Sequence, residues 1–203
     1  MGMAMLESAR YYVAMLLVIS LPGVILYWFS VHPFIDFWRR LDARLALAIN
    51  YGLILAVSVA LFQVRKPLLS IEYGANPALI AISAVLLAVS AALRRKLSRH
   101  LPFKTLTGLP ELDPGRYPSR LVTEGPYARV RHPRYVQMML AVLAYALFAN
   151  YLAGYLTVLI CAVLGYFLVL VEEKELCGRF GTEYEAYANR VPRFFPRRGR
   201  RGN

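Results

Sequence analysis

Two short groups of polar residues could bind a charged ligand at the edge of an otherwise apolar chain. One is the run Arg131-His132-Pro133-Arg134-Tyr135, and the other is the acidic pair Glu172-Glu173. Pro133 suits the first turn of a helix, and a helix start gathers N–H groups that favour an anion such as a carboxylate. The acidic pair supplies the opposite charge. A ligand that carries both a carboxylate and an ammonium group would fit between the two groups.

The apolar stretches of the chain predict where these groups lie. With 58% hydrophobic residues, the 203-residue chain is too apolar for an ordinary soluble domain. A helix needs roughly 20 apolar residues to cross a bilayer, and five stretches approach that length. They cover residues 11–30, 45–62, 77–93, 133–149 and 151–171. The sequence therefore predicts an all-α fold, a polytopic membrane helical bundle of about five transmembrane helices.

The last two stretches are predicted to form a helical hairpin over residues 133–171. Only Asn150 separates them, and helices joined so tightly pack antiparallel. The far ends of the hairpin then meet at one membrane surface. This places 131–135 and 172–173 side by side, although about 40 residues separate them in the sequence.

The chain divides into two parts of different character. Residues 1–100 hold three scaffold helices with few polar groups, whereas residues 101–203 form the catalytic part. Prolines and glycines between 101 and 127 prevent a long helix, so this segment is expected to form a lid or wall. In the tail, Gly181 should break the helix, and the pattern from Thr182 to Glu185 is typical of a capping box.

The distribution of positive charge predicts the orientation in the membrane. The net charge is +12, and most of the 24 Lys and Arg residues follow the first span, the third span or the fifth. Only Arg10, Arg65 and Lys66 fall in the other loops. Because basic loops stay in the cytoplasm, we expect the N-terminus outside and the C-terminus and site in the cytoplasm. This distribution favours interaction with membrane lipids and argues against nucleic acid as the partner.

Two further function classes receive no support from the residues. Charged side chains are missing from the interiors of the first three spans, which argues against a coupled transporter. His32, His100 and His132 have no cysteine or carboxylate at ligand spacing, so no metal site is predicted. The sequence does not specify an oligomeric state.

The region from about 121 to 196 resembles the isoprenylcysteine carboxyl methyltransferases and their phospholipid methyltransferase relatives. The likeness rests on order and spacing in 121–127 (LVTEGPY), 131–135 (RHPRY), Glu172-Glu173 and the tail residues up to Pro192. It implies a membrane enzyme that uses S-adenosyl-L-methionine (SAM) without a Rossmann domain. Carried over by position, the residues that would bind SAM are Leu121, Val122, Tyr127, His132, Pro133, Arg134, Tyr135 and Glu172.

Two positions depart from the family pattern. Gln137 stands where the family usually has glycine, and a longer side chain there would alter helix packing or the substrate path. Leu168 stands where the enzymes that methylate prenylated cysteine carry an arginine. The resemblance therefore implies SAM as cofactor but leaves the acceptor open.

The leading hypothesis is methylation of a lipid-like acceptor. A prenylated thiol-carboxylate comes first and a phospholipid (ethanolamine) amine second. Glu172 would help to hold SAM, while Glu173 and Arg190 would orient or activate the acceptor as catalytic residues. An amine must lose a proton, and Glu173 is the nearby base that the sequence offers. Two alternatives stay open: a reductase on a related scaffold, and a non-enzymatic lipid-binding membrane protein with a degenerate site.

Overall fold

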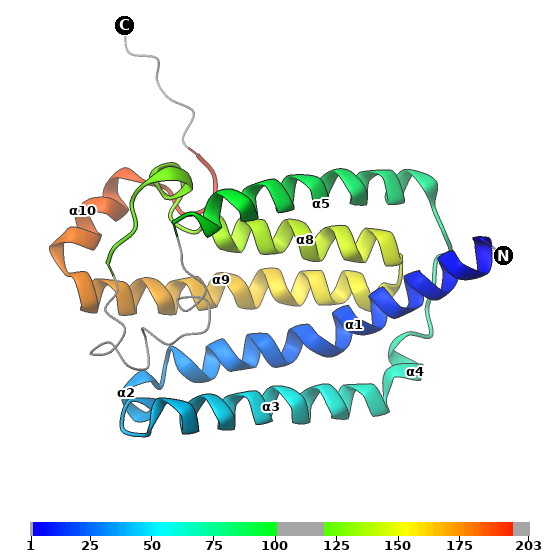
Figure 1. The fold of residues 1–203 in the computed structure, drawn as a ribbon, viewed down its shortest axis with the longest axis horizontal. Coiled ribbons are helices and arrows are strands. Elements are labelled where there is room, and N and C mark those ends of the chain that lie inside the picture. The colour runs from blue at the N-terminus through cyan, green and yellow to red at the C-terminus, as the bar shows by residue number, and fades with distance from the viewer. Residues whose placement is uncertain (1, 101–119, 197–203) are drawn as a thin grey trace, which may run out of the picture.

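A computed structural model describes residues 2–100 and 120–196, and within these ranges it is a bundle of helices (Figure 1). The predicted all-α fold is confirmed. In these described ranges, five long helices run back and forth along one axis, and four short ones lie at the ends of the bundle. The long helices are α1 (Gly2–Val31), α3 (Ala43–Gln63), α5 (Pro77–Ser98), α8 (Pro133–Ala149) and α9 (Leu152–Phe180). The short ones are α2 (Ile35–Trp38), α4 (Arg65–Leu68), the 3-10 helix η1 (Gly125–Ala128) and α10 (Thr182–Arg190).

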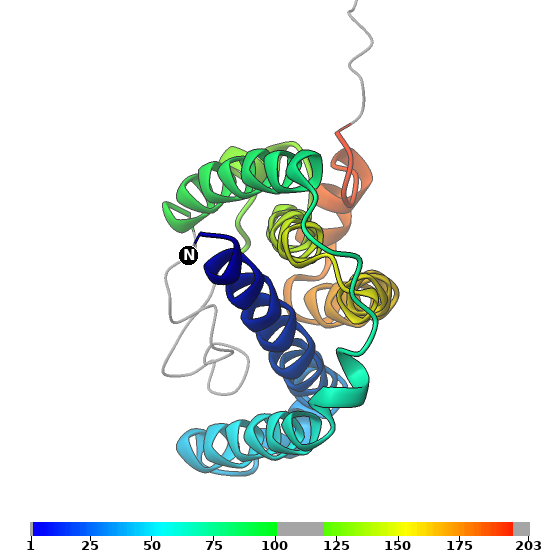
Figure 2. The ribbon, with the colours of Figure 1, turned by 90° about the vertical axis from the view of Figure 1, so that its right-hand side faces the viewer.

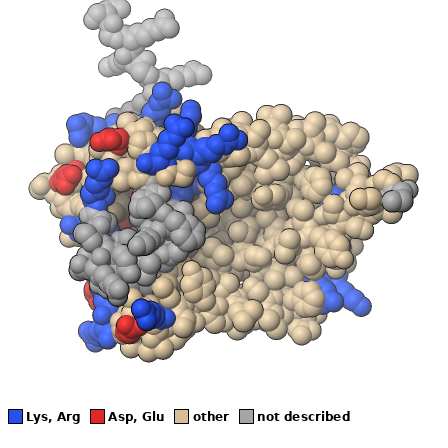
Figure 3. Space-filling view, in the orientation of Figure 1, with Lys and Arg blue, Asp and Glu red and all other residues tan. Residues whose placement is uncertain are grey.

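The surface of the bundle fits a membrane. Helices α1, α3, α5 and α9 are each long and apolar enough to cross a bilayer, and α8 is a shorter apolar helix of 17 residues. Charged side chains gather at the end that carries α10, while the long middle of the visible face is uncharged (Figure 3). Large apolar side chains such as Leu55 and Val85 are exposed along α3 and α5. These faces are suited to contact with lipid tails.

Helix α1 lies between α3 on one side and the α8–α9 pair on the other, and α5 packs along α8 (Figure 2). Small hydroxyl side chains join these helices. Ser58 Oγ of α3 donates to Ile19 O of α1 at 3.2 Å, and Ser83 Oγ of α5 donates to Ala144 O of α8 at 2.7 Å. Hydroxyls of this kind let helices pack without leaving a polar atom unpaired in an apolar environment.

Gln137, one of the two departures from the family pattern, takes part in this packing. Its Nε2 donates to Ser90 Oγ at 2.8 Å, and that hydroxyl donates to Gln137 O at 3.0 Å. The long side chain therefore joins α8 to α5, the last of the helices that the sequence assigned to the scaffold.

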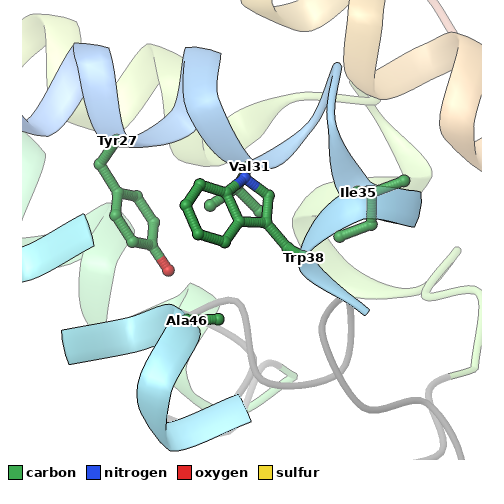
Figure 4. Close-up of a cluster of buried hydrophobic side chains, with 5 residues drawn as sticks. All are labelled: Tyr27, Val31, Ile35, Trp38 and Ala46. Carbon is green, nitrogen blue, oxygen red and sulfur yellow. The ribbon is translucent and has the colours of Figure 1, made fainter. Parts of the chain in front are cut away.

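A hydrophobic cluster packs the last turns of α1 against α2 and α3. It consists of Tyr27, Val31, Ile35, Trp38 and Ala46, all buried (Figure 4). Trp38 Nε1 also donates to Ser30 O at 2.9 Å. This packing sets the position of Trp28 in the last turns of α1 and of His32 directly after the helix.

The predicted hairpin of α8 and α9 is present. Asn150 turns the chain with a left-handed φ of 56°, and its side-chain amide donates to Gly74 O at 2.9 Å. Helix α9 continues to Phe180, beyond the predicted end at 171, so Glu172 and Glu173 lie inside a helix. Helix α10 begins at Thr182 as expected, but the N-cap residue is Gly181 and makes no side-chain cap. The predicted capping box is therefore wrong, because Thr182 already belongs to the helix.

Arg10 joins α1 to the end of the hairpin at which α8 turns into α9. Its side chain is fully buried, with Nε donating to Ala149 O at 3.1 Å. Its Nη1 forms ion pairs with Glu7 and with Glu72, the latter at 2.9 Å. In the sequence, Arg10 served only to predict the orientation in the membrane. In the structure, its contacts join α1 to the hairpin and to the segment before α5.

We expect the variant Gly23→Leu to destabilise the bundle. A Cβ atom at Gly23 would lie 3.2 Å from Ile54 Cα and Ile54 O, so any side chain pushes α1 away from α3. Overpacking of this kind costs about 1 to 3 kcal/mol, or roughly 2 to 12 °C in the melting temperature of a protein of this size. Thermal unfolding of the purified protein in detergent measures the shift.

Gly52→Leu is the matched control, because nothing lies within 4 Å of a Cβ atom at Gly52 on the same pair of helices. Equal melting temperatures for the two variants would contradict the close α1–α3 contact.

Candidate active site

A cavity of about 600 Å³ lies among α1, α8 and α9 at the end of the bundle that carries α10. Seven of the residues predicted to bind SAM line it: Leu121, Val122, Tyr127, His132, Arg134, Tyr135 and Glu172. Pro133 is buried beside them at the start of α8. Much of the segment predicted to form a lid, residues 101–119, lies outside the described residues. Within its described part, Arg120, Leu121, Val122 and Tyr127 line the cavity.

Glu172 lines the cavity and accepts a short hydrogen bond. Tyr135 Oη donates to Glu172 Oε2 at 2.6 Å, and His132 Nδ1 lies 3.9 Å from the same oxygen. The first turn of α8 thus meets the acidic pair, as the hairpin predicted. About a quarter of the Glu172 side chain is exposed, so a ligand in the cavity can contact its carboxylate.

Glu173 has a different environment from its neighbour. It is buried, and it lies in a cluster of positive side chains. Arg131 Nη2 is 2.8 Å from its Oε1, and Arg193 Nη2 is 2.8 Å from its Oε2. His132 Nε2 lies 3.1 Å from Oε1. Both oxygens are therefore occupied by partners within the protein, and two guanidinium groups favour the ionised carboxylate.

This cluster docks the tail onto the start of α8. Arg131 N donates to Pro192 O at 2.8 Å, and His132 N donates to Arg193 O at 3.0 Å. The Glu173 carboxylate that accepts a hydrogen bond from Arg193 raises the pKa of that guanidinium. Backbone and side-chain contacts together hold residues 192–193 against the entrance of the cavity.

Three tyrosines form the wall beneath the tail. Tyr187 Oη donates to Tyr127 O at 2.7 Å, and the rings of Tyr184 and Tyr187 are 6.0 Å apart. Burial raises the pKa of Tyr187 to about 12 and the pKa values of Tyr127 and Tyr184 above their usual range. All three phenols stay neutral at physiological pH. Tyr184 and Tyr187 are buried and line the cavity.

Arg190, predicted to act on the acceptor, is exposed and is not among the described residues that line the cavity. Its Nε donates to Ala186 O on the same helix, at 3.2 Å. Arg193 and Arg131, rather than Arg190, contact the acidic pair.

The cavity also includes one residue of α1 and the residue that follows this helix, neither of which belongs to a sequence motif. Trp28 and His32 line it, one turn apart. His32 Nδ1 lies 2.7 Å from Glu175 Oε2 on α9. The sequence held no signal for this pair, because 143 residues separate the two side chains.

Away from the polar entrance, the cavity is apolar. Its inner part is lined by side chains such as Met139, Leu143 and Leu168. A second groove of about 360 Å³ between α1 and α9 shares Ile25 and Cys161 with the cavity. The arrangement suits an amphipathic ligand, with a polar group at the entrance and an apolar chain inside.

A family model described as phospholipid methyltransferase matches residues 78–183. The chain belongs to the phospholipid methyltransferase family. The match covers α5, α8, α9 and the first residues of α10, and so includes both polar groups of the cavity entrance. It confirms the family that the motifs indicated and extends it to α5. Helix α1 with Trp28, and His32 directly after it, lie outside the matched residues.

Two curated relatives of this methyltransferase-family chain are named for resistance to metals. The cobalt-zinc-cadmium resistance protein CzcN of Cupriavidus metallidurans is 36% identical over 83 residues, which are 41% of this chain and 38% of that protein. The nickel-cobalt-cadmium resistance protein NccN of Alcaligenes xylosoxydans xylosoxydans is 34% identical over 83 residues, 41% of this chain and 39% of that protein. The chain thus matches about two fifths of the length of these relatives. No solved structure matches it.

Proposed function

We propose that the protein is a SAM-dependent methyltransferase that acts on a membrane lipid. The observation that carries this proposal is the cavity, whose mixed-charge entrance leads into an apolar interior of lipid-facing helices. Membership in the phospholipid methyltransferase family supports the reaction class. The cavity supports a lipid-like acceptor, because its polar entrance can contact a headgroup and its apolar interior can contact an acyl or prenyl chain.

The residues at the entrance fit SAM as a zwitterion. Glu172 presents a carboxylate to the cavity for an ammonium group, and Arg134 with the start of α8 offers positive charge for a carboxylate. Tyr184 lines the same cavity.

When bound, SAM supplies a methyl group on a sulfonium, which a nucleophile of the acceptor displaces in line. The side chains of the protein would align the two partners and keep water out of the cavity. Glu173 is saturated by Arg131, Arg193 and His132, so in this proposal it positions the entrance and does not act as the base. Arg190 would act only through the tail, because its side chain lies outside the cavity.

A phospholipid amine is the acceptor class that we favour, and a prenylated cysteine carboxylate is the second. Leu168, buried in the cavity wall at the position where prenylcysteine enzymes carry arginine, offers no charge to a carboxylate. The family description points in the same direction. We further propose that this end of the bundle faces the cytoplasm, since most Lys and Arg side chains on the visible face of the described chain gather there (Figure 3).

The names of the two relatives raise a second question, namely metal binding. Within residues 2–100 and 120–196, no group of three or more His, Cys, Asp or Glu side chains lies close enough together to hold a metal ion. Our proposal therefore rests on the cavity and the family.

Incubation of the purified protein with labelled SAM and a whole membrane lipid extract tests the proposal. We expect the label in one class of lipid, identified by mass spectrometry, and SAM binding that calorimetry detects in detergent. Absence of both heat and transfer would favour a lipid-binding protein, and binding of NADPH without SAM would favour a reductase. Either result would contradict the proposed function.

A further inference from the structure

Helices α1 and α9 lie side by side (Figure 1) and contact each other on both sides of the groove between them. Near the start of α9, a Cβ atom at Gly154 would lie 3.7 Å from Leu17 Cδ2 of α1. Near the end of α9, Glu175 Oε2 lies 2.7 Å from Nδ1 of His32, which directly follows α1. The groove lies between these two contacts, at residues 22–29 of α1 and 157–164 of α9. Both helices can cross a bilayer, so the groove lies within the part of the bundle that lipid surrounds.

Two residues separate the groove from the cavity. Ile25 of α1 and Cys161 of α9 line both spaces. Their neighbours in the chain, Leu26 and Ile160, line only the groove and are 45% and 53% exposed. The groove therefore adjoins the cavity on its inner side and reaches the lipid-facing surface on its outer side.

The residues of the groove suit a hydrocarbon chain. None of the eight lining residues that the structure describes carries a charge. Thr157 supplies a hydroxyl, which donates to Ala153 O of the same helix at 2.8 Å. A headgroup in the groove would leave its polar atoms without partners, at a large cost in free energy, whereas an acyl chain gains by leaving no apolar wall empty.

The cavity and the groove together offer two apolar spaces next to one polar entrance. The inner cavity, lined by side chains such as Met139 and Leu143, has room for one chain of an acceptor. The groove begins at Ile25 and Cys161, where the cavity wall ends. A lipid with two chains would fill both spaces, whereas a prenylated cysteine has a single chain.

We infer that the acceptor is a two-chain lipid whose second acyl chain lies in the groove between α1 and α9. The first chain lies in the inner cavity, and the headgroup lies at the polar entrance. The inference rests on the proposed function and deepens it, because it assigns a binding site to each chain of a phospholipid. It also gives α1, which lies outside the matched residues 78–183, a part in acceptor binding.

Tryptophan substitutions that fill the groove test the inference. Ile160→Trp and Leu26→Trp add an indole from the α9 wall and the α1 wall, and both positions are exposed enough to accept it. Leu159→Trp is the matched control, because Leu159 is 60% exposed beside Ile160 and is not among the described residues that line the groove or the cavity. The assay uses the full chain in mixed micelles with saturating SAM. Dioleoyl phosphatidylethanolamine and its one-chain lyso form are each varied in mole fraction.

We expect the unchanged protein to have a KM for the two-chain lipid about tenfold or more below that for the one-chain lipid. Burial of only about two methylene groups accounts for a factor of this size. Ile160→Trp and Leu26→Trp should raise KM for the two-chain lipid by about the same factor and so remove most of the difference. Leu159→Trp should keep the difference, and all three variants should bind SAM as tightly as the unchanged protein.

Equal KM values for the two lipids in the unchanged protein would overturn the inference, because the second chain would then have no site. Equal effects of Ile160→Trp and Leu159→Trp would overturn it as well, since the groove would then hold only lipids of the surrounding bilayer. Methylation of N-acetyl-S-farnesylcysteine but of neither phospholipid would contradict the inference and leave methyl transfer in place. If the unchanged protein methylates none of the three acceptors, the proposed function fails together with the inference.

Discussion

Glu172→Gln protein is expected to bind SAM roughly 10- to 100-fold more weakly than the unchanged protein, the value of a hydrogen bond to a charged group. Glu172 supplies the one carboxylate among the described residues that line the cavity. The substitution keeps the size of the side chain and an oxygen for the Tyr135 hydroxyl, which now lies 2.6 Å away. It removes the charge that would meet the ammonium group. Calorimetry of SAM binding in detergent measures the change, and methyl transfer at low SAM should fall with it.

Tyr135→Phe and Glu183→Gln are the matched controls for Glu172. Tyr135→Phe removes only the hydroxyl that orients the carboxylate and leaves the charge of Glu172 in place, so its effect on SAM affinity should be smaller, about threefold to tenfold. Glu183→Gln removes a carboxylate from the exposed face of α10 and should leave the affinity unchanged. If Glu172→Gln protein binds SAM as tightly as the unchanged protein, Glu172 does not hold the cofactor.

Glu173→Gln is expected to have its main effect on stability. The carboxylate lies between Arg131 and Arg193 and meets His132 as well, with only 12% of its side chain exposed. Removing one partner from a buried ion pair costs about 3 to 5 kcal/mol, or roughly 6 to 20 °C in melting temperature for a protein of this size. Because the cluster docks residues 192–193 on the start of α8, the tail should also become accessible to protease. Thermal unfolding and limited proteolysis, both without SAM, provide the measurements.

The same variant distinguishes the two roles that Glu173 could have. A positioning role predicts a lower melting temperature and cleavage of the tail by protease, even when no substrate is present. The variant could instead have a normal melting temperature and an intact tail but no methyl transfer. That result would indicate that Glu173 acts as the base. Glu185→Gln, an exposed carboxylate on α10, serves as the control and should change neither readout.

Much of the architecture follows from short-range signals in the sequence. Apolar stretches of membrane length predict the helices, because a bilayer leaves no other way to satisfy the backbone. Asn150 between two such stretches predicts the hairpin, and the hairpin brings the run at 131–135 next to Glu172 and Glu173. The bounds are less well predicted, since α9 runs on to Phe180 although its apolar part ends at 171. Polar residues continue a helix readily once it leaves the bilayer.

The different roles of adjacent carboxylates were decided by tertiary structure. Neighbours on a helix point about 100° apart, and the sequence does not tell which of them faces the cavity. The docked tail determines which carboxylate faces the cavity. Arg193 and Arg131 pair with Glu173, whereas Glu172 lines the cavity. Arg190 could not be placed from its motif either, since the direction of its side chain depends on how α10 packs.

The sequence by itself determined the helices, the family and the pair of polar groups at one end of the hairpin. All three depend on residues close together in the chain or on a motif of constant spacing. Only the tertiary structure decided that Trp28 and His32, at the end of α1, complete the cavity, that Gln137 joins α8 to α5, and that Arg10 joins α1 to the turn of the hairpin. These contacts join segments from 47 to 143 residues apart, and their partners are set by helix packing, which no local pattern encodes.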